Sequence, residues 1–416
     1  MPHICIIGAG VIGLTTAWRL AEDGHQITLI DGGEQAASGA SHANGGQLSY
    51  HYIAPLADAG MPLKALGWLL QSDAPMRWQP AADLAQWRWL WRFLLACNTA
   101  THQRNLLKLW QLAMHSRLQM RDFAALPHAD YARQCNGKLV VFRSAAGFAA
   151  ARRGMTALAR LGAEQQALDG AACLALEPAL AAVAYRLAGG IFTAAEEVAD
   201  CLQFCQKLEA RLLTLPNVRL RYRTQATGFG QHQGRIDSVQ LDHGDAIACN
   251  HVVIAAGCHS PALARLLGDR LNLYPLKGYS LDMPAGAQPP TVSITDADHK
   301  ILYAPINGRL RVAALADLTG MDDSLDPQRL QSLTRRIAAD MPMAGKLPHA
   351  RPWAGLRPAT PDGLPLIGKG RYDNAWYNTG HGALGFTLAA GSADLLARRI
   401  AGEQEPASLR GLFQPG

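Results

Sequence analysis

The sequence has little charge and no long apolar run. Of its 416 residues, 17% are charged and 49% are hydrophobic, a composition that excludes a disordered chain. No apolar stretch approaches the roughly 18 residues that a transmembrane helix needs. The eight cysteines form no CxxC pair, and the first predicted strand leaves no room for a signal peptide. We therefore expect reduced thiols in a cytoplasmic protein without a structural metal.

Acidic residues are absent from residues 84–121, although the net charge of the whole chain is only +6. That excess is too small to imply a nucleic-acid partner. The segment contains six cations: Arg88, Arg92, Arg104, Lys108, Arg117 and Arg121. Its tryptophans and arginines recur at helical spacing, which suits an interfacial helix on an anionic membrane. A helix whose Leu90, Trp91, Leu94 and Leu95 face the core would give the same pattern, so the sequence leaves both hypotheses open.

The first 31 residues have the pattern of a βαβ unit. An apolar run at 3–7 precedes the sequence GAGVIG at 8–13, a helical pattern follows, and a second apolar run at 26–30 ends in Asp31. In such units Gly8 makes the turn, Gly10 admits a pyrophosphate, Gly13 lets helix and strand approach, and Asp31 accepts a ribose hydroxyl. The pattern predicts dinucleotide binding and leaves FAD and NAD open.

Two further glycine-rich segments favour a flavin. Residues 39–47 (GASHANGGQ) are small and polar, and can bring backbone N–H groups to the far phosphate and the flavin ring. Residues 380–385 (GHGALG) open a second helix, but too few residues follow for another nucleotide unit. The free N–H groups of that helix could stabilise a reduced flavin, or the glycines could serve helix packing alone.

These motifs together resemble a known family. GAGVIG, SHANGGQLS, VVIAAG, YPLKGYSL, WAGLRPATPDGLPLIG and NTGHGALGFTLAAGSADLL are similar, end to end, to motifs of the bacterial FAD-dependent D-amino acid dehydrogenases of the small-subunit type, within the glycine oxidase and D-amino acid oxidase superfamily. The resemblance implies FAD contacts at Gly8, Gly10, Val11, Ile12, Gly13, Asp31, Ser41, Asn44, Gly45, Gly46, Gln47, Ala226, Ala256, Gly257, Gly382, Leu384 and Gly385.

The resemblance also implies a substrate site. Arg357 matches the arginine that binds the substrate carboxylate, for which a planar guanidinium is suited. A tyrosine partner is not uniquely placed, and Tyr279, Tyr303 and Tyr52 are the candidates. His51 and His381 have exchangeable protons near the predicted site and could equally be structural. Gly355 occupies the position of the flavin-linking cysteine of sarcosine oxidases, so non-covalent FAD is expected. No metal is expected in the site.

The predicted fold is α/β, with a Rossmann-type FAD-binding domain and a discontinuous α+β substrate domain that contains an antiparallel sheet. We expect the FAD domain at 1–60, 172–262 and 350–416 and the substrate domain at 61–171 and 263–349. Residues 57–125 should be largely helical, 138–142 a strand, 218–227 a short strand near the adenine, and 273–315 antiparallel strands.

The activity implied by the resemblance is oxidation of D-amino acids by hydride transfer to FAD, giving 2-oxo acids and ammonia. Electrons would pass to a quinone or another respiratory acceptor, and residues 84–121 would contact the inner face of the membrane. Alternatives are a D-hydroxyproline dehydrogenase, a glycine or sarcosine-type oxidase, a nicotinamide dehydrogenase, or a non-catalytic membrane-binding flavoprotein.

Overall fold

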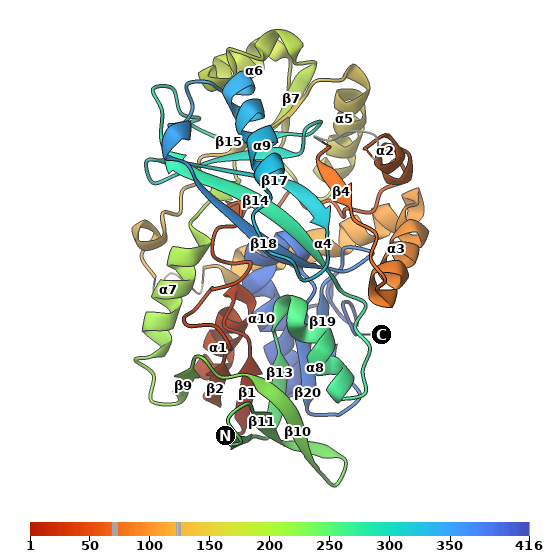
Figure 1. The fold of residues 1–416 in the computed structure, drawn as a ribbon, viewed down its shortest axis with the longest axis vertical. Helices are drawn as coiled ribbons and strands as arrows, with labels where there is room; N and C mark the ends of the chain where they lie inside the picture. The colour runs from red at the N-terminus through yellow and green to blue at the C-terminus, as the bar shows by residue number, and fades with distance from the viewer. Residues whose placement is uncertain (69–73, 122, 124–125, 416) are drawn as a thin grey trace.

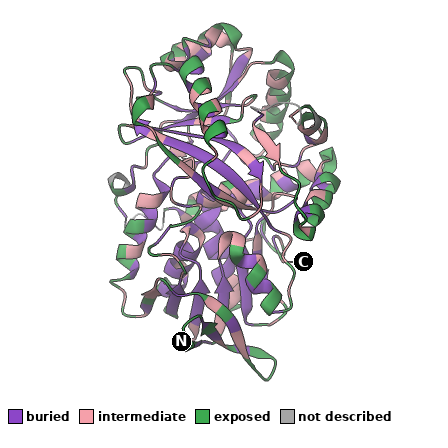
Figure 2. Ribbon diagram, in the orientation of Figure 1, coloured by how far each residue is buried: buried purple, intermediate pink, exposed green. Residues whose placement is uncertain are grey.

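The computed structural model describes residues 1–68, 74–121, 123 and 126–415. The body is elongated, with a mainly parallel sheet in one half and a large, mostly antiparallel sheet in the other (Figure 1). Both sheets are buried along most of their length, and the exposed residues gather on the outer helices (Figure 2). No helix in these ranges is long and apolar enough to cross a bilayer.

The parallel sheet is built around the N-terminal strand. The strand order is β19-β20-β13-β1-β2-β9, and only β19 runs antiparallel to its neighbour. These strands are β1 (His3–Ile7), β2 (Gln26–Ile30), β9 (Val218–Arg221), β13 (His251–Ile254), β19 (Leu366–Lys369) and β20 (Ala375–Thr379). Their near-continuous burial follows from helices on both faces, as parallel sheets require.

Four helices of this half pack together. They are α1 (Val11–Glu22), α4 (Thr99–Gln119), α7 (Cys201–Leu212) and α10 (Gly385–Ala401). Gly391 permits the close approach of α10 to α4, because a Cβ there would lie 2.8 Å from the backbone of Ser116. The Ser116 hydroxyl donates to the Thr387 carbonyl and accepts from the Gly391 N–H. Cys201 and Cys205 are buried on α7 as ordinary helix residues.

The large sheet has the order β18-β14-β17-β16-β15-β5-β7-β6, and β4 pairs with β17. Its strands are β4 (Met76–Trp78), β5 (Lys138–Phe142), β6 (Gln166–Leu168), β7 (Gly189–Thr193), β14 (Tyr274–Pro284), β15 (Ser293–Asp296), β16 (Ile301–Ile306), β17 (Arg309–Leu318) and β18 (Arg351–Ala359). Helix α9 (Pro327–Asp340) covers one face, where the apolar side chains form a second core.

The remaining elements are small. A three-stranded sheet combines β10 (Ala226–His232), β11 (Arg235–Leu241) and β12 (Ala246–Ala248), and β3 (Gln47–Leu48) pairs with β8 (Glu197–Val198). The outer helices are α2 (Met61–Trp68), α3 (Leu84–Ala96), α5 (Ala145–Ala159), α6 (Gly170–Leu176) and α8 (Ser260–Leu266).

The α/β fold class and the N-terminal βαβ unit are confirmed, as is the strand at 138–142. The expectation of one strand over 218–227 is wrong, because β9 ends at Arg221 and β10 begins at Ala226 in a different sheet. Antiparallel pairing in 273–315 holds among β14 to β17, but β15 also pairs in parallel with β5.

The division into two domains stays a prediction. The sheet pairings differ from the predicted ranges at two strands: β7 and β18 fall in ranges expected for the FAD domain, yet both belong to the large sheet. We therefore propose that these two strands be grouped with the substrate domain.

Candidate cofactor and substrate site

The turn between β1 and α1 leaves no space for a side chain at Gly8 or Gly13. Gly8 has φ of +114°, and a Cβ there would lie 2.5 Å from the Ala255 carbonyl oxygen. A Cβ at Gly13 would overlap the carbonyl of Gly8. Both glycines are therefore required for helix α1 to begin directly above the ends of β1 and β13.

Two polar side chains hold this turn. The Asp31 carboxylate accepts from the Ala9 N–H at 2.6 Å and from the Gly33 N–H at 2.7 Å. The Ser41 hydroxyl accepts from the Val11 N–H at 3.0 Å. A carboxylate has about four acceptor sites, so Asp31 retains capacity for a ribose hydroxyl.

The N-terminus of α1 fits the pyrophosphate of FAD. Gly10 is the N-cap and provides no side-chain hydrogen bond, and the N–H groups of Ile12 and Gly13 have no acceptor among the described residues. Free N–H groups at the positive end of a helix dipole are suited to a phosphate.

Three other expected cofactor residues are Ala226, Ala256 and Gly257. Ala256 and Gly257 follow β13 after one intervening residue, and Gly257 has φ of +53°. Ala226 begins β10. Ala256 and Gly257 thus lie at the carboxyl end of a strand of the parallel sheet, where such sheets bind ligands, whereas Ala226 belongs to the three-stranded sheet, and its contact with the adenine stays a prediction.

The segment after Asp31 runs to the large sheet. The Asn44 side chain accepts from the Gly46 N–H at 3.0 Å, and Gly46 has φ of +62°. A Cβ at Gly45 would overlap Leu302 of β16. The glycines thus let residues 44–47 pass close to the large sheet, between the two halves of the molecule.

The C-terminal glycine turn lies beside the strand that carries Arg357. Residues Gly382–Leu384 form a single 3₁₀ turn, η7, before α10, and η7 packs against β18. His381 pairs with Ala359 by a β-bridge. The space where a Cβ of Gly382 would lie is open, and no side chain caps the N-terminus of α10.

His381 itself is buried and uncharged. Its Nε2 lies 2.9 Å from the Ser392 hydroxyl, while its Nδ1 has no partner among the described residues. Burial lowers the pKa of His381 to about 3. A structural role fits this environment better than proton transfer near neutral pH.

Arg357 is a partly buried cation without a contacting carboxylate. It lies on β18 opposite Leu276 of β14, and its Nη1 donates to the Leu315 carbonyl at 3.0 Å. Burial lowers the pKa of Arg357 to about 10, and the charge of Asp317 opposes that shift. Asp317 already forms ion pairs with Arg329 at 2.7 Å and Arg77 at 2.9 Å, so Arg357 remains free to pair with a ligand carboxylate.

Tyr279 and Tyr303, two of the candidate partners of Arg357, lie in the core of the large sheet, so their role in the substrate site stays a prediction that this placement does not favour. Each is 1% exposed and packs in the core beneath α9. Strand residues alternate between faces: Arg357 lies directly opposite Leu276, on the face that Ser280 uses to contact the Ala43 carbonyl. Tyr279 therefore points to the opposite face of the sheet from Arg357, and its hydroxyl donates to Asp317 at 3.3 Å.

Tyr52 and His51 occupy a different environment. The ring of Tyr52 lies 4.5 Å from the Lys138 ammonium, and Tyr52 is 38% exposed. The Nδ1 of His51 lies 2.9 Å from the buried carboxylate of Glu196, which also accepts the backbone N–H groups of Tyr50 and His51. The Glu196 carboxylate thus fixes the backbone at Tyr50 and His51, but it does not test Tyr52 as the partner of Arg357.

Lys138 was not predicted as a site residue. It is 1% exposed, and its Nζ donates to Gln47 Oε1 at 2.5 Å and to the Ser49 hydroxyl at 3.3 Å. Gln47 in turn donates to Ser293 at 2.7 Å. Burial lowers the pKa of Lys138 to about 7. In the sequence, Lys138 is only the first residue of an apolar strand, and a lysine side chain is normally exposed.

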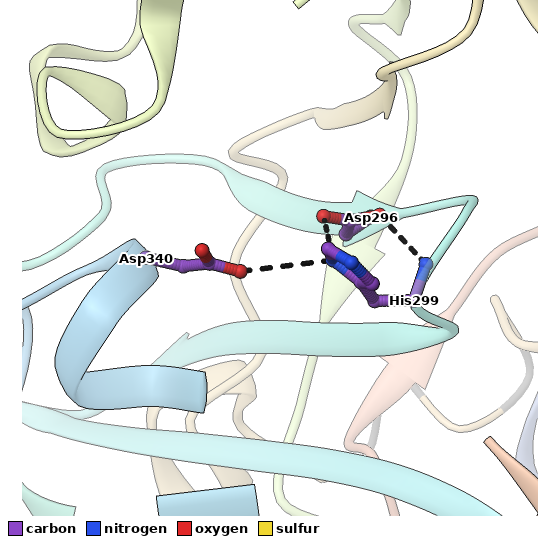
Figure 3. A group of neighbouring side chains, drawn as sticks. All are labelled: Asp296, His299 and Asp340. Atoms are coloured by element: carbon purple, nitrogen blue, oxygen red, sulfur yellow. Dashed lines mark hydrogen bonds and ion pairs between the residues drawn. The ribbon is translucent and has the colours of Figure 1, made fainter. Parts of the chain in front are cut away.

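A separate cluster of Asp296, His299 and Asp340 has the donor types of a metal site (Figure 3). The His299 ring lies 3.0 Å from Asp296 and 3.7 Å from Asp340. Arg143 bridges the same two carboxylates at 2.7 Å each. Because the Arg143 guanidinium already contacts both acids, we interpret the cluster as an ion-pair network joining β15 to α9.

Helix α3 contradicts the core-packing pattern that the sequence left open. Its buried face consists of Gln86, Trp89, Phe93 and Ala96, whereas Trp91, Leu94 and Leu95 are exposed, Trp91 by 64%. Leu90 alone of the four expected core residues packs against the interior. An apolar surface thus remains on α3.

Known proteins are similar to this chain along most of its length. The model of the FAD dependent oxidoreductase family (DAO) matches residues 3–399. The chain is 48% identical to the D-amino acid dehydrogenase 2 of Pseudomonas aeruginosa, over 100% of this chain and 98% of that protein. It is 45% identical to the D-amino acid dehydrogenase 2 of Ralstonia nicotianae, over 96% of each.

Solved structures share the fold at low identity. The glycine oxidase of Geobacillus kaustophilus has a TM-score of 0.78 at 20% identity, covering 100% of this chain and 99% of that one. The L-proline dehydrogenase of P. horikoshii has a TM-score of 0.73 at 15% identity, covering 100% and 96%. The chain belongs to the FAD-dependent oxidoreductase family and is a flavin-dependent enzyme. This membership confirms FAD as the cofactor that the glycine turns predicted.

Proposed function

We propose that this enzyme oxidises D-amino acids to 2-imino acids, which water hydrolyses to 2-oxo acids and ammonia. The proposal rests on the 48% identity to a D-amino acid dehydrogenase and on one observation. Arg357 is a partly buried cation that no carboxylate of the described residues contacts. A substrate carboxylate would supply the missing counter-charge in a bidentate pair.

The protein's part in this reaction is binding and orientation. When bound, FAD accepts the hydride that leaves Cα together with its bonding electron pair. The N–H groups at the start of α1, with Asp31 and Ser41, would hold the nucleotide, and those at the start of α10 would face the flavin. Arg357 would fix the substrate by its carboxylate, so that Cα is oriented without a nucleophile or strong base.

We propose further that the electrons pass to a quinone or another respiratory acceptor, and that residues 84–121 contact the inner face of the membrane. The exposed Trp87 and Trp91 beside Arg88 and Arg92 on α3 support this contact, since aromatic rings suit the headgroup level and cations suit anionic lipid.

The test of substrate class is a panel of D- and L-amino acids, glycine, sarcosine and D-hydroxyproline with an artificial dye as acceptor. D-Alanine should bleach the flavin absorbance under argon, and L-alanine should not. Preference for glycine, sarcosine or an L-amino acid would refute the proposed substrate. A soluble quinone that reoxidises the bleached enzyme faster than oxygen would support the proposed acceptor, and the reverse order would contradict it.

Membrane contact is tested by sedimentation with anionic liposomes at low salt. The wild type should bind, and binding should weaken with added salt and when Arg88, Arg92 and Lys108 are changed to Glu, while the soluble dye-linked activity is kept. Equal sedimentation with and without liposomes would exclude the contact.

A further inference from the structure

A cavity of about 390 Å³ lies between helix α3, helix α8 and the segment that leads into β14. Helix α3 is at the side of the molecule and α8 is below it (Figure 1). Arg88 and Arg92 line the cavity from α3, Arg265 lines it from α8, and Arg270 from the following segment. Residues distant in the sequence thus place four guanidinium groups around one hollow.

None of these four arginines forms an ion pair or a side-chain hydrogen bond with any residue that the structure describes. Among the described residues that line the cavity, none is acidic. Several other arginines of this protein are paired, as Arg311 is with Asp282 and Asp200. Four unpaired cations around one cavity repel one another, and a bound anion would remove that repulsion.

Asn272 gives a second, independent indication. It lines the same cavity, and its side-chain amide nitrogen is buried without a hydrogen-bond partner. A buried donor that lacks an acceptor is costly, so such groups are rare in folded proteins. A rotation of the Asn272 side chain would let an oxyanion in the cavity provide the acceptor.

We propose that this cavity binds a phosphate ester. Guanidinium groups bind phosphate oxygens in pairs of parallel hydrogen bonds, and four arginines exceed what a single carboxylate can neutralise. A cavity of this size also accommodates an organic group beyond the phosphate. Leu271 and Leu273 offer apolar contacts for that group.

The phosphate can come from two sources: a free phosphorylated metabolite or the headgroup of an acidic phospholipid. The exposed Leu84, Trp91 and Leu95 share one face of α3 with Arg88, so a lipid could present its headgroup here. The site depends on neither the substrate nor the electron acceptor proposed above.

The first experiment is calorimetric titration of the FAD-loaded enzyme with inorganic pyrophosphate, since FAD occupies the other phosphate-binding turn. The cavity variant is Arg265→Gln with Arg270→Gln, which leaves α3 unchanged. The matched control is Arg153→Gln with Arg160→Gln, two exposed arginines of α5 and its C-cap. The flavin spectrum and the dye-linked activity report folding of each variant.

The second experiment measures binding of the same proteins to vesicles of phosphatidylglycerol and phosphatidylcholine. Saturable pyrophosphate binding that weakens at least about tenfold in the cavity variant and not in the control supports a free phosphate ester, because charged hydrogen bonds are lost. Vesicle binding alone with the same dependence on Arg265 and Arg270 supports a lipid headgroup. Absence of both, or an equal loss in the control variant, overturns the proposal.

Discussion

The guanidinium of Arg357 lies against the backbone of Gly278. In the antiparallel pair of β14 and β18, Arg357 is opposite Leu276, and Gly278 is the next residue of β14 on the same face. A Cβ added to Gly278 would overlap the Arg357 guanidinium. Arg357, which we propose to bind the substrate carboxylate, can therefore take this position only because Gly278 has no side chain.

Gly278→Ala should displace this guanidinium without unfolding the sheet, because the overlapping atoms end a flexible side chain. We expect KM for D-alanine to rise roughly ten- to a hundredfold, since small misplacements of a binding group have effects of that size. The control is Gly154→Ala on α5, where a Cβ meets open space. An unchanged KM in Gly278→Ala would mean that Arg357 does not bind the substrate.

Arg357→Ala should remove about 3 kcal/mol of substrate interaction, roughly a hundredfold in kcat/KM, with the FAD spectrum unchanged. Arg357→Lys should recover only part of this, because lysine keeps the charge but not the planar pair of donors. Arg351→Ala, an exposed arginine of the same strand, is the control. Wild-type kinetics for D-alanine in Arg357→Ala would contradict the carboxylate role.

Asp31→Ala should weaken FAD binding roughly tenfold or more, because a charged acceptor is lost, and should not change the order in which substrates are oxidised. Asp31→Asn should retain more FAD than Asp31→Ala, since its carbonyl oxygen can still accept one of the N–H groups of Ala9 and Gly33. Occupancy is read from the ratio of flavin to protein absorbance. Full occupancy in Asp31→Ala would remove this residue from the cofactor site.

FAD should leave the protein intact on acid or heat denaturation. At Gly355, where the resemblance would place a linking cysteine, a side chain would overlap the Trp353 ring. Cys258 donates to the Leu356 carbonyl nearby, and burial raises the pKa of its thiol to about 12, so it is not a thiolate at neutral pH. Flavin absorbance that remains in the precipitate would refute this prediction.

The sequence predicted the parts of the site that depend on local backbone geometry. The turn at Gly8 and Gly13 and the acid at Asp31 have fixed spacing, and the spacing implies the βαβ unit. Predicting them does not require knowing how distant strands pair.

The sequence could not distinguish the tyrosines or find Lys138. Which face of β14 a residue occupies depends on its register with β17 and β18, and a shift by one residue reverses it. Tyr279 was therefore indistinguishable from a residue on the face of Arg357. Lys138 becomes buried only because residues 47–52 cross over β5, a contact between segments about 90 residues apart.

Lys138 should make the stability of the FAD-loaded enzyme depend on pH. Burial lowers its pKa from 10.5 to about 7, and the charge of Glu196 opposes that shift. Below pH 7 the folded and unfolded chains both hold the proton, so the buried ammonium destabilises the fold by a constant amount. Between pH 7 and 10.5 only the unfolded chain holds it, and the free energy of unfolding therefore rises with pH.

Lys138→Met removes this titration. The difference in free energy of unfolding between wild type and Lys138→Met should move in favour of the wild type from pH 7 to pH 9, by at most about 1.4 kcal/mol per pH unit. Urea midpoints at pH 6, 7, 8 and 9 measure it, and the two proteins should run parallel between pH 6 and the onset near 7. The exposed Lys346 provides the control variant Lys346→Met, which should follow the wild type throughout. A constant difference between wild type and Lys138→Met from pH 6 to 9 would show that Lys138 stays protonated in the fold, held by Gln47, Ser49 and the face of Tyr52.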